Sequence, residues 1–89
     1  MELTEKTALI TGGGVRVGRA LAIALAQAGC NVFIHYGSSR EGAADTQAEI
    51  EKLGRKAYIY SANLADADAT SAIISEAQTI FGQVDILIN

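Results

Sequence analysis

The segment ITGGGVRVG, residues 10–18, combines glycines and an arginine in a spacing that could bind an anion. It follows a short apolar run and precedes a long alanine-rich segment, so it predicts a turn between a strand and a helix. At such a turn, unpaired backbone N–H groups and the positive end of the helix dipole meet at one point. The segment therefore predicts a loop that binds phosphate, and the alternative is a tight turn without a ligand.

The spacing within this loop narrows the kind of phosphate that it could hold. No lysine follows the glycines, which argues against a loop of the Walker type for a nucleoside triphosphate. The pattern is also not quite the G-x-G-x-x-G of dinucleotide-binding proteins. The candidate binding residues of this loop are Gly12, Gly14, Arg16, Val17 and Gly18.

The elements that must position this loop follow from the periodicity of apolar residues. Four short apolar runs predict strands, at residues 7–10, 31–36, 56–62 and 85–88. Between them, three segments of helical period predict helices at about residues 17–28, 41–53 and 66–81. A glycine follows each helix, and Asp66 is the expected N-cap of the third. The residues expected to face the core are Leu21, Ala24, Leu25, Ala28, Ala43, Thr46, Ile50, Leu53, Thr70, Ile73, Ala77 and Ile80.

The order β-α-β-α-β-α-β predicts an α/β fold in which helices cover both faces of a parallel sheet. The chain has 89 residues and ends at Asn89, directly after a strand, so we expect it to be part of a larger domain. The net charge of −3 and the lack of a basic cluster argue against a nucleic acid or membrane partner. We expect a cytoplasmic protein, because the N-terminus has no leader pattern and the single cysteine, Cys30, cannot form an internal disulfide. Cys30 is expected to be a small buried residue.

Two motifs resemble the short-chain dehydrogenase/reductase family. TGGGVRVG resembles its T-G-x-x-x-G-x-G motif, and DILIN resembles the start of its DILINNAG segment. The two motifs flank the chain, so the resemblance covers essentially all of residues 1–89. It implies a Rossmann-type, doubly wound sheet and identifies residues 1–89 as the N-terminal, cofactor-binding portion of one domain. The family binds NAD(P)(H), and its complete members are commonly homotetramers or dimers.

Arg16 stands where many family members have glycine, and this variant resembles the T-G-x-x-x-R-x-G motif of pteridine reductases. The segment HYGSSRE after the second strand resembles their H-Y-x-x-S segment. This resemblance implies a pterin or dihydrofolate as substrate, whereas other reductases of the family act on 3-oxoacyl thioesters, sugars or steroids.

The end of the second strand predicts which nicotinamide cofactor binds. NAD-specific Rossmann proteins have an acidic residue there for the ribose 2′-hydroxyl, and this chain has Tyr36. Ser38, Ser39 and Arg40 offer donors suited to a 2′-phosphate, and Arg16 could add a second charge from the neighbouring loop. The segment therefore predicts NADP(H), and the alternative is a polar loop that leads into the second helix.

The resemblance also implies roles beside the adenosine for Asn63 and Leu64, which follow the third strand, and for Asn89. His35, Tyr58 and Tyr60 are interpreted as packed strand residues rather than catalytic groups, and no metal site is expected.

The family's chemistry is hydride transfer, with a proton from the tyrosine of a Y-x-x-x-K motif and a serine that orients the substrate. No tyrosine of this chain has a lysine four residues later, so we assign no catalytic residue. The main hypothesis is the cofactor-binding portion of an NADP(H)-dependent reductase with a small-molecule substrate. The alternatives are a non-catalytic NADP(H)-sensing module and, third, a methyltransferase with a nucleoside cofactor, although the acidic residue expected after its second strand is missing.

Overall fold

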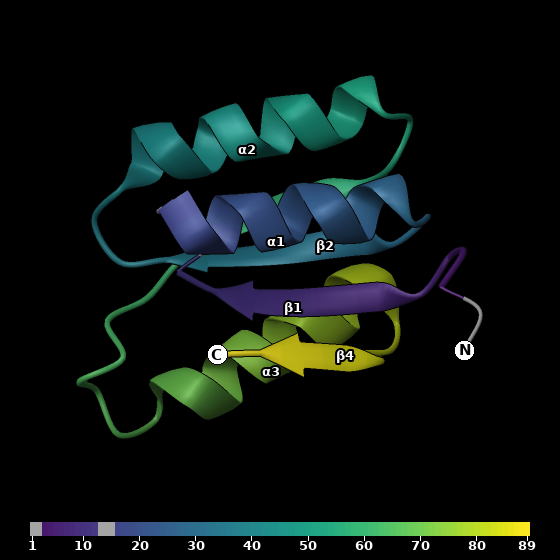
Figure 1. Cartoon of the computed structure of the whole chain (residues 1–89). Helices are drawn as coiled ribbons and strands as arrows, with labels where there is room; N and C mark the ends of the chain where they lie inside the picture. Colours follow the sequence, from purple (N-terminus) through teal and green to yellow (C-terminus); the bar gives the residue numbers. More distant parts are fainter. Residues whose placement is uncertain (1–2, 13–15) are drawn as a thin grey trace.

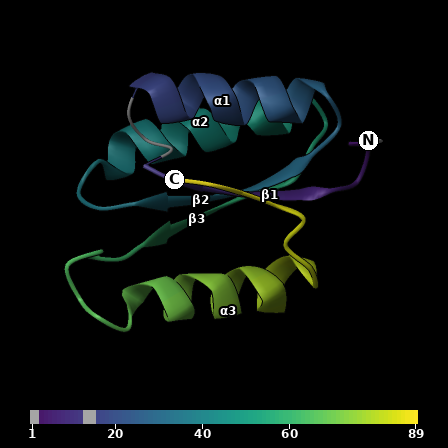
Figure 2. The same cartoon turned by 60° about the horizontal axis from the view of Figure 1, so that its bottom comes forward.

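The computed structural model describes residues 3–12 and 16–89, which form one parallel sheet with helices on both faces (Figure 1). In chain order the elements are β1 (Thr7–Thr11), α1 (Arg16–Gln27), β2 (Asn31–Tyr36), α2 (Arg40–Lys52), β3 (Ala57–Ser61), α3 (Ala69–Phe81) and β4 (Ile86–Ile88). Helices α1 and α2 cover one face, and α3 covers the other (Figure 2). The predicted α/β fold with a doubly wound parallel sheet is therefore confirmed.

The strand order is β3-β2-β1-β4, with every neighbouring pair parallel. Leu9 in β1 is paired with Phe33 of β2 on one side and with Leu87 of β4 on the other. The chain thus leaves β1 toward β2 in one direction, and β4 returns to the opposite side of β1. Doubly wound sheets bind ligands in the crevice at this reversal, beyond the carboxyl ends of the strands.

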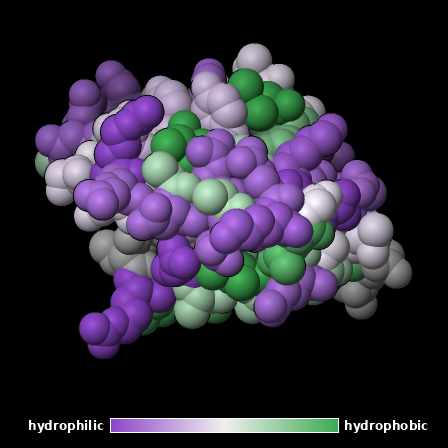
Figure 3. Space-filling model, turned by 90° about the horizontal axis from the view of Figure 1, so that it is seen from above, coloured by the Kyte–Doolittle hydropathy of each residue, from purple (hydrophilic) through white to green (hydrophobic). Residues whose placement is uncertain are grey.

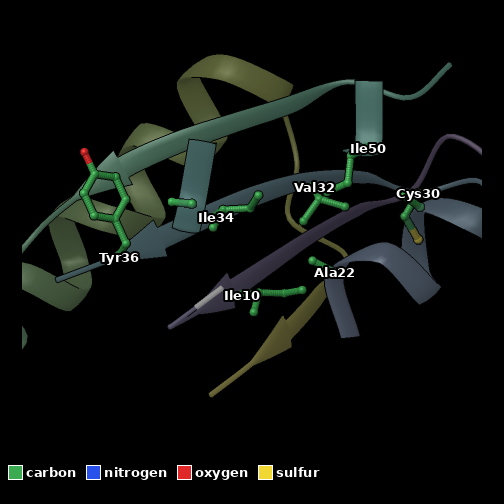
Figure 4. Packing of buried hydrophobic residues seen from close by; sticks show 9 residues of the cluster. Ile10, Ala22, Cys30, Val32, Ile34, Tyr36 and Ile50 are labelled. Carbon is green, nitrogen blue, oxygen red and sulfur yellow. The ribbon is translucent and has the colours of Figure 1, made fainter. Parts of the chain in front are cut away.

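Two buried clusters hold the layers together. On the α1 and α2 face, Ile10, Val32 and Ile34 pack against alanines of both helices and against Ile50 (Figure 4). On the α3 face, Phe33 packs with Leu9 and Ile73, and its ring stacks on that of Tyr58 with centroids 5.4 Å apart. Tyr60 packs against the same ring at 5.8 Å. The interpretation of Tyr58 and Tyr60 as packing residues is therefore confirmed.

The buried face of α1 differs from the predicted one. Leu21, Ala24 and Ala28 are exposed and Leu25 is half-buried, whereas the fully buried positions are Gly18, Ala22 and Ala26. These three residues follow an i, i+4, i+8 row, the row that forms a ridge on a helix surface. Because the row carries a hydrogen or a single methyl group at each position, the helix can lie close to the sheet. The pattern of hydrophobic residues predicted that the larger leucines would be buried, whereas close packing of the helix on the sheet favours smaller residues at the buried positions.

Helices α2 and α3 follow the expected faces in part. Ala43, Thr46 and Ile50 are buried as predicted, and Leu53 is exposed just beyond the end of α2. The outer surface on this side is mostly hydrophilic (Figure 3). In α3 the buried row is Ala69, Ile73 and Ala77, again spaced by four, so the predictions for Thr70 and Ile80 were wrong.

The start of α3 also differs from the prediction, since Asp68 rather than Asp66 holds the N-cap position. The carboxylate of Asp66 instead accepts a hydrogen bond from the Asp68 backbone N–H at 3.0 Å, and its carbonyl accepts one from Ala69 N–H at 3.1 Å. Aspartate stabilises such local turns as readily as it caps helices. Because of this turn, α3 begins at Ala69, three residues later than predicted.

Gly29, between α1 and β2, provides a test of the fold. Its φ is 106°, and an added Cβ would lie 2.9 Å from the Thr4 Cα, which is backbone. Gly54 has a similar φ of 80° but open space around it. We expect Gly54→Ala to lower the free energy of unfolding by roughly 1–2 kcal/mol from backbone strain alone. Gly29→Ala should lower it by about 1–3 kcal/mol more because of the clash. Urea denaturation of both variants measures the difference, and equal losses would show that the contact with Thr4 is absent.

Candidate functional site

The carboxyl ends of all four strands lie at one edge of the sheet, the left edge in Figure 1. The loops that leave these ends carry the predicted site residues. The ends of β1 and β2, with the first turns of the helices α1 and α2 that follow them, contribute Gly12, Arg16, Val17, Gly18, Tyr36, Ser38, Ser39 and Arg40. The segments after β3 and β4 contribute Asn63, Leu64 and Asn89. Gly14 lies outside the described residues. The structure thus brings the described candidates to one edge, although they are spread over most of the chain.

The loop after β1 turns sharply at Gly12, whose φ of 72° is in the left-handed region. Such a conformation suits glycine because other residues meet their own Cβ there. Arg16 is the first residue of α1 and is exposed, and that first turn contains no acidic residue. No ion pair joins Arg16 to another residue of ranges 3–12 and 16–89. A cation beside the positive end of a helix dipole is unfavourable unless an anion binds there.

Val17 and Gly18 occupy opposite environments in the first turn of α1. The Val17 side chain is 70% exposed, whereas Gly18 is buried against the sheet. Gly18 therefore allows the close approach of helix to strand, and Val17 faces outward beside the loop.

At the end of β2, Tyr36 combines a buried ring with a polar tip. Its ring is 6% exposed and ends the row of packed side chains in Figure 4, with the hydroxyl directed away from the cluster. The Arg40 Nη1 donates a hydrogen bond to this hydroxyl at 2.9 Å. Ser38 and Ser39 are exposed between the two, and Ser39 is at the N-cap of α2 without a side-chain capping bond. The Arg40 guanidinium and two hydroxyl groups therefore lie at the end of β2.

A hollow of about 520 Å³ lies beside these residues, between the ends of β2 and β3. Its lining comprises His35, Gly37, Ser38, Ser61, Ala62, Asn63 and Leu64. The Asn63 Oδ1 accepts a hydrogen bond from the Ala65 N–H at 3.0 Å, so its acceptor already stabilises the local turn. Leu64 is 50% exposed and offers an apolar surface. A hollow with apolar surface and a few polar groups can hold a planar ring such as a purine.

Asn89 lies next to the glycine-rich loop. The Thr11 Oγ1 is 3.4 Å from the Ile88 carbonyl oxygen and 3.5 Å from the Asn89 Oδ1. The two motifs at opposite ends of the chain are therefore neighbours in space, because β1 and β4 pair in parallel.

His35 is packed in β2, as predicted, with 4% of its surface exposed. Its Nε2 lies 2.8 Å from the Ala62 carbonyl oxygen, and its Nδ1 accepts a longer hydrogen bond of 3.4 Å from the Gly12 N–H. Sequence reasoning missed these contacts. The available signal was the position of His35 one residue before the end of a strand that leads into the candidate site.

Three groups with shifted pKa values lie away from this edge. Cys30 is fully buried, which confirms the prediction of a small buried residue. Burial raises the pKa of its thiol, and this disfavours a reactive thiolate. Burial and the nearby Glu76 carboxylate raise the pKa of Tyr58. The hydrogen bond and charge of Arg55 lower the pKa of Glu5.

A second hollow, of about 540 Å³, lies at the amino ends of the strands, with Arg55 in its lining. Arg55 is fully engaged there, because it pairs with Glu5 at 2.6 Å and donates to the Gly29 carbonyl at 2.9 Å. We therefore place the candidate site at the carboxyl edge. Within the described ranges, no group of three or more His, Cys, Asp or Glu residues could hold a metal ion. No helix among these residues is long and apolar enough to cross a membrane.

Mutation can separate the contributions of the Tyr36 ring and the Tyr36 hydroxyl to stability. Tyr36→Phe keeps the buried ring and removes only the acceptor for Arg40, so it should lower the free energy of unfolding by about 0.5–1.5 kcal/mol. Tyr36→Ala leaves a cavity and should lower it by about 3–5 kcal/mol. Chemical denaturation measures both, and a loss for Tyr36→Phe as large as that for Tyr36→Ala would contradict a role of the ring in packing.

Comparisons with known proteins agree with this arrangement. The chain matches the short chain dehydrogenase family over residues 6–89. It is 40% identical over 89 residues to the 3-oxoacyl-[acyl-carrier-protein] reductase FabG of Staphylococcus aureus, covering 100% of this chain and 36% of that protein. It is 39% identical over 90 residues to an L-rhamnose 1-dehydrogenase (NAD(P)(+)) of a Sphingomonas species, covering 100% of this chain and 35% of the relative. A solved structure of a putative dehydrogenase from Burkholderia cenocepacia with bound NADP superposes with a TM-score of 0.95 at 36% identity, covering 99% of this chain and 34% of the other.

These relatives are longer, and the chain spans about a third of the length of the curated proteins that it matches. The resemblance of Arg16 and HYGSSRE to pteridine reductases stays a prediction. Because the family match extends over nearly the whole sequence, the chain belongs to the short-chain dehydrogenase family.

Proposed function

We propose that this chain is the NADP(H)-binding portion of a short-chain oxidoreductase. The complete protein would transfer hydride between NADP(H) and a carbonyl, an alcohol or a pterin-type substrate. The observation that carries the proposal is the set of groups around the end of β2. Arg40 and two serine hydroxyls follow a strand end that has a tyrosine where NAD-specific proteins have a carboxylate, and Arg16 begins the helix after the neighbouring strand β1.

The described residues fit a dinucleotide. The first turn of α1, which follows the turn at the left-handed Gly12, would hold the pyrophosphate by backbone N–H groups and the helix dipole. The hollow lined by Ala62, Asn63 and Leu64 would take the adenine. The nicotinamide ring, when bound, supplies the hydride, and the residues of this chain bind and orient the adenosine half.

The 2′-phosphate distinguishes NADP from NAD, and the positive charges of this site would favour a ligand that carries this phosphate. Arg16 and Arg40 would each interact with it, and the Arg40 guanidinium is held at the strand end by its bond to Tyr36. A charge-assisted contact between guanidinium and phosphate is about twice as strong as a neutral hydrogen bond. The first carboxylate after β2 is Glu41, which follows Arg40 in the first turn of α2.

The names of the relatives support a nicotinamide cofactor. One solved neighbour holds NADP, and the Sphingomonas relative is named for NAD(P)(+). The S. aureus relative is named as a reductase of a 3-oxoacyl group, which supports a carbonyl substrate, whereas Arg16 and HYGSSRE support a pterin. No Y-x-x-x-K motif occurs in these 89 residues, so the proton donor would lie in another part of the complete protein.

The proposal is tested by fluorescence titration of NADPH and NADH with the complete protein. We expect NADPH to bind at least tenfold more tightly, about 1.4 kcal/mol. Arg16→Ala should remove most of this preference, because it removes one of the charges that face the 2′-phosphate.

Lys52→Ala is the matched control, since it removes an exposed cation at the far end of α2 and should leave the preference unchanged. Equal binding of the two cofactors by the wild type would refute the assignment to NADP(H). Tight NADPH binding without any reductase activity on carbonyl or pterin substrates would instead indicate a sensing module.

A further inference from the structure

The His35 side chain connects two segments that do not touch each other through strand pairing. Gly12 follows β1 and Ala62 follows β3, and the sheet order places β2 between these strands. From β2, the imidazole reaches the Gly12 N–H with Nδ1 at 3.4 Å and the Ala62 carbonyl with Nε2 at 2.8 Å. The backbone of β2 makes parallel connections, from Gly12 N–H to the His35 carbonyl at 3.0 Å and from Ala62 N–H to the Tyr36 carbonyl at 3.1 Å.

The chemistry of the two partners fixes the tautomer of the ring. The Ala62 carbonyl can only accept, so Nε2 must carry the hydrogen. The Gly12 N–H can only donate, and it shares its hydrogen between the His35 carbonyl at 3.0 Å and Nδ1 at 3.4 Å, which fits an Nδ1 without a hydrogen. A neutral imidazole with its hydrogen on Nε2 satisfies both contacts from a side chain that is 4% exposed.

The connected segments are the two sides of the proposed cofactor site. Gly12 begins the phosphate-binding loop, and Ala62 lines the hollow beside Asn63 and Leu64. His35 itself contributes to the wall of that hollow. A dinucleotide must contact both sides at once, so its affinity depends on the spacing between them being set before it binds.

We propose that His35 is a positioning residue that fixes Gly12, at the end of β1, relative to the adenine-binding segment. This inference rests on the proposed binding of a dinucleotide at the carboxyl edge. It assigns to His35 a role in the affinity for a ligand that contacts both sides, rather than for adenosine alone.

The test uses three substitutions in the complete protein. The amide oxygen of His35→Asn can replace Nδ1, so this variant can keep the contact to Gly12. The amide nitrogen of His35→Gln can replace Nε2, so this variant can keep the contact to Ala62. His35→Phe fills a similar volume and keeps neither contact. Tyr58→Phe is the control, because it removes a hydrogen bond from β3 to Glu76 of α3, away from His35, Gly12 and Ala62.

Each variant is titrated with NADPH and, separately, with adenosine, which carries no phosphate, and its thermal unfolding is measured without ligand. We expect His35→Phe to weaken NADPH binding by about tenfold, or about 1.4 kcal/mol, with Asn and Gln variants between it and the wild type. Binding of adenosine, which would contact only the hollow beside Ala62, should change by less than about threefold. Tyr58→Phe should bind both ligands as the wild type does.

Equal losses for both ligands would overturn the positioning role, as would NADPH affinity unchanged in His35→Phe. If His35→Phe does not fold, the Asn and Gln variants decide the question by the same comparison. In the wild type, ¹⁵N chemical shifts of the imidazole should show the Nε2–H tautomer, and an Nδ1–H ring would also refute the proposal. A wild type that binds neither NADPH nor NADH would refute the proposed function itself, whereas normal wild-type binding with unaffected variants would refute the role of His35 alone.

Discussion

Parallel pairing of β1 with β2 and with β4 is the interaction on which the rest of the structure depends. It satisfies the backbone N–H and C=O groups of strands that are buried between two helical layers, where unpaired polar groups would be strongly destabilising. Parallel strands also have all their carboxyl ends at one edge, so each connection must cross back as a helix. The common edge and the helix N-termini that begin there are therefore two consequences of one pairing.

The same pairing explains why the candidate binding residues lie at that edge. Every helix that follows a strand begins near the strand's carboxyl end, and its unpaired N–H groups favour negative charge there. A cation such as Arg16 in this position lowers stability in the free protein, because it lies beside the positive end of the α1 dipole. An anionic ligand would reverse the sign of this effect, and the edge is thus suited to a phosphate-bearing cofactor more than to an uncharged one.

Much of the fold could be predicted from the sequence, because apolar periodicity and glycine reflect local conformation. The four strands and three helices match the predicted segments within a few residues, and Gly29, Gly54 and Gly82 all have positive φ. The buried face of α1 could not be predicted in this way. Hydrophobicity predicts that Leu21 is buried. The residues that are buried belong to the row of Gly18 and Ala22, because the helix lies close to the sheet, and the distance between helix and sheet is a tertiary property.

The candidate site shows the same division between local and tertiary information. The glycine, arginine and serine residues identified the candidate binding segments in the sequence. The parallel topology of the sheet then brings these segments to one edge. The two contacts of His35 could not be derived from its neighbours in sequence, because Gly12 and Ala62 are 23 and 27 residues away. Tyr36 and His35 are buried and pack within this edge of the sheet. The exposed candidate residues at the same edge are Arg16, Ser38, Ser39 and Arg40. Exposed residues make few packing contacts, so the proposed cofactor preference could change by substitution at these four positions with little loss of stability. The buried pair has no such freedom, since any replacement must preserve both the core and the spacing of the site.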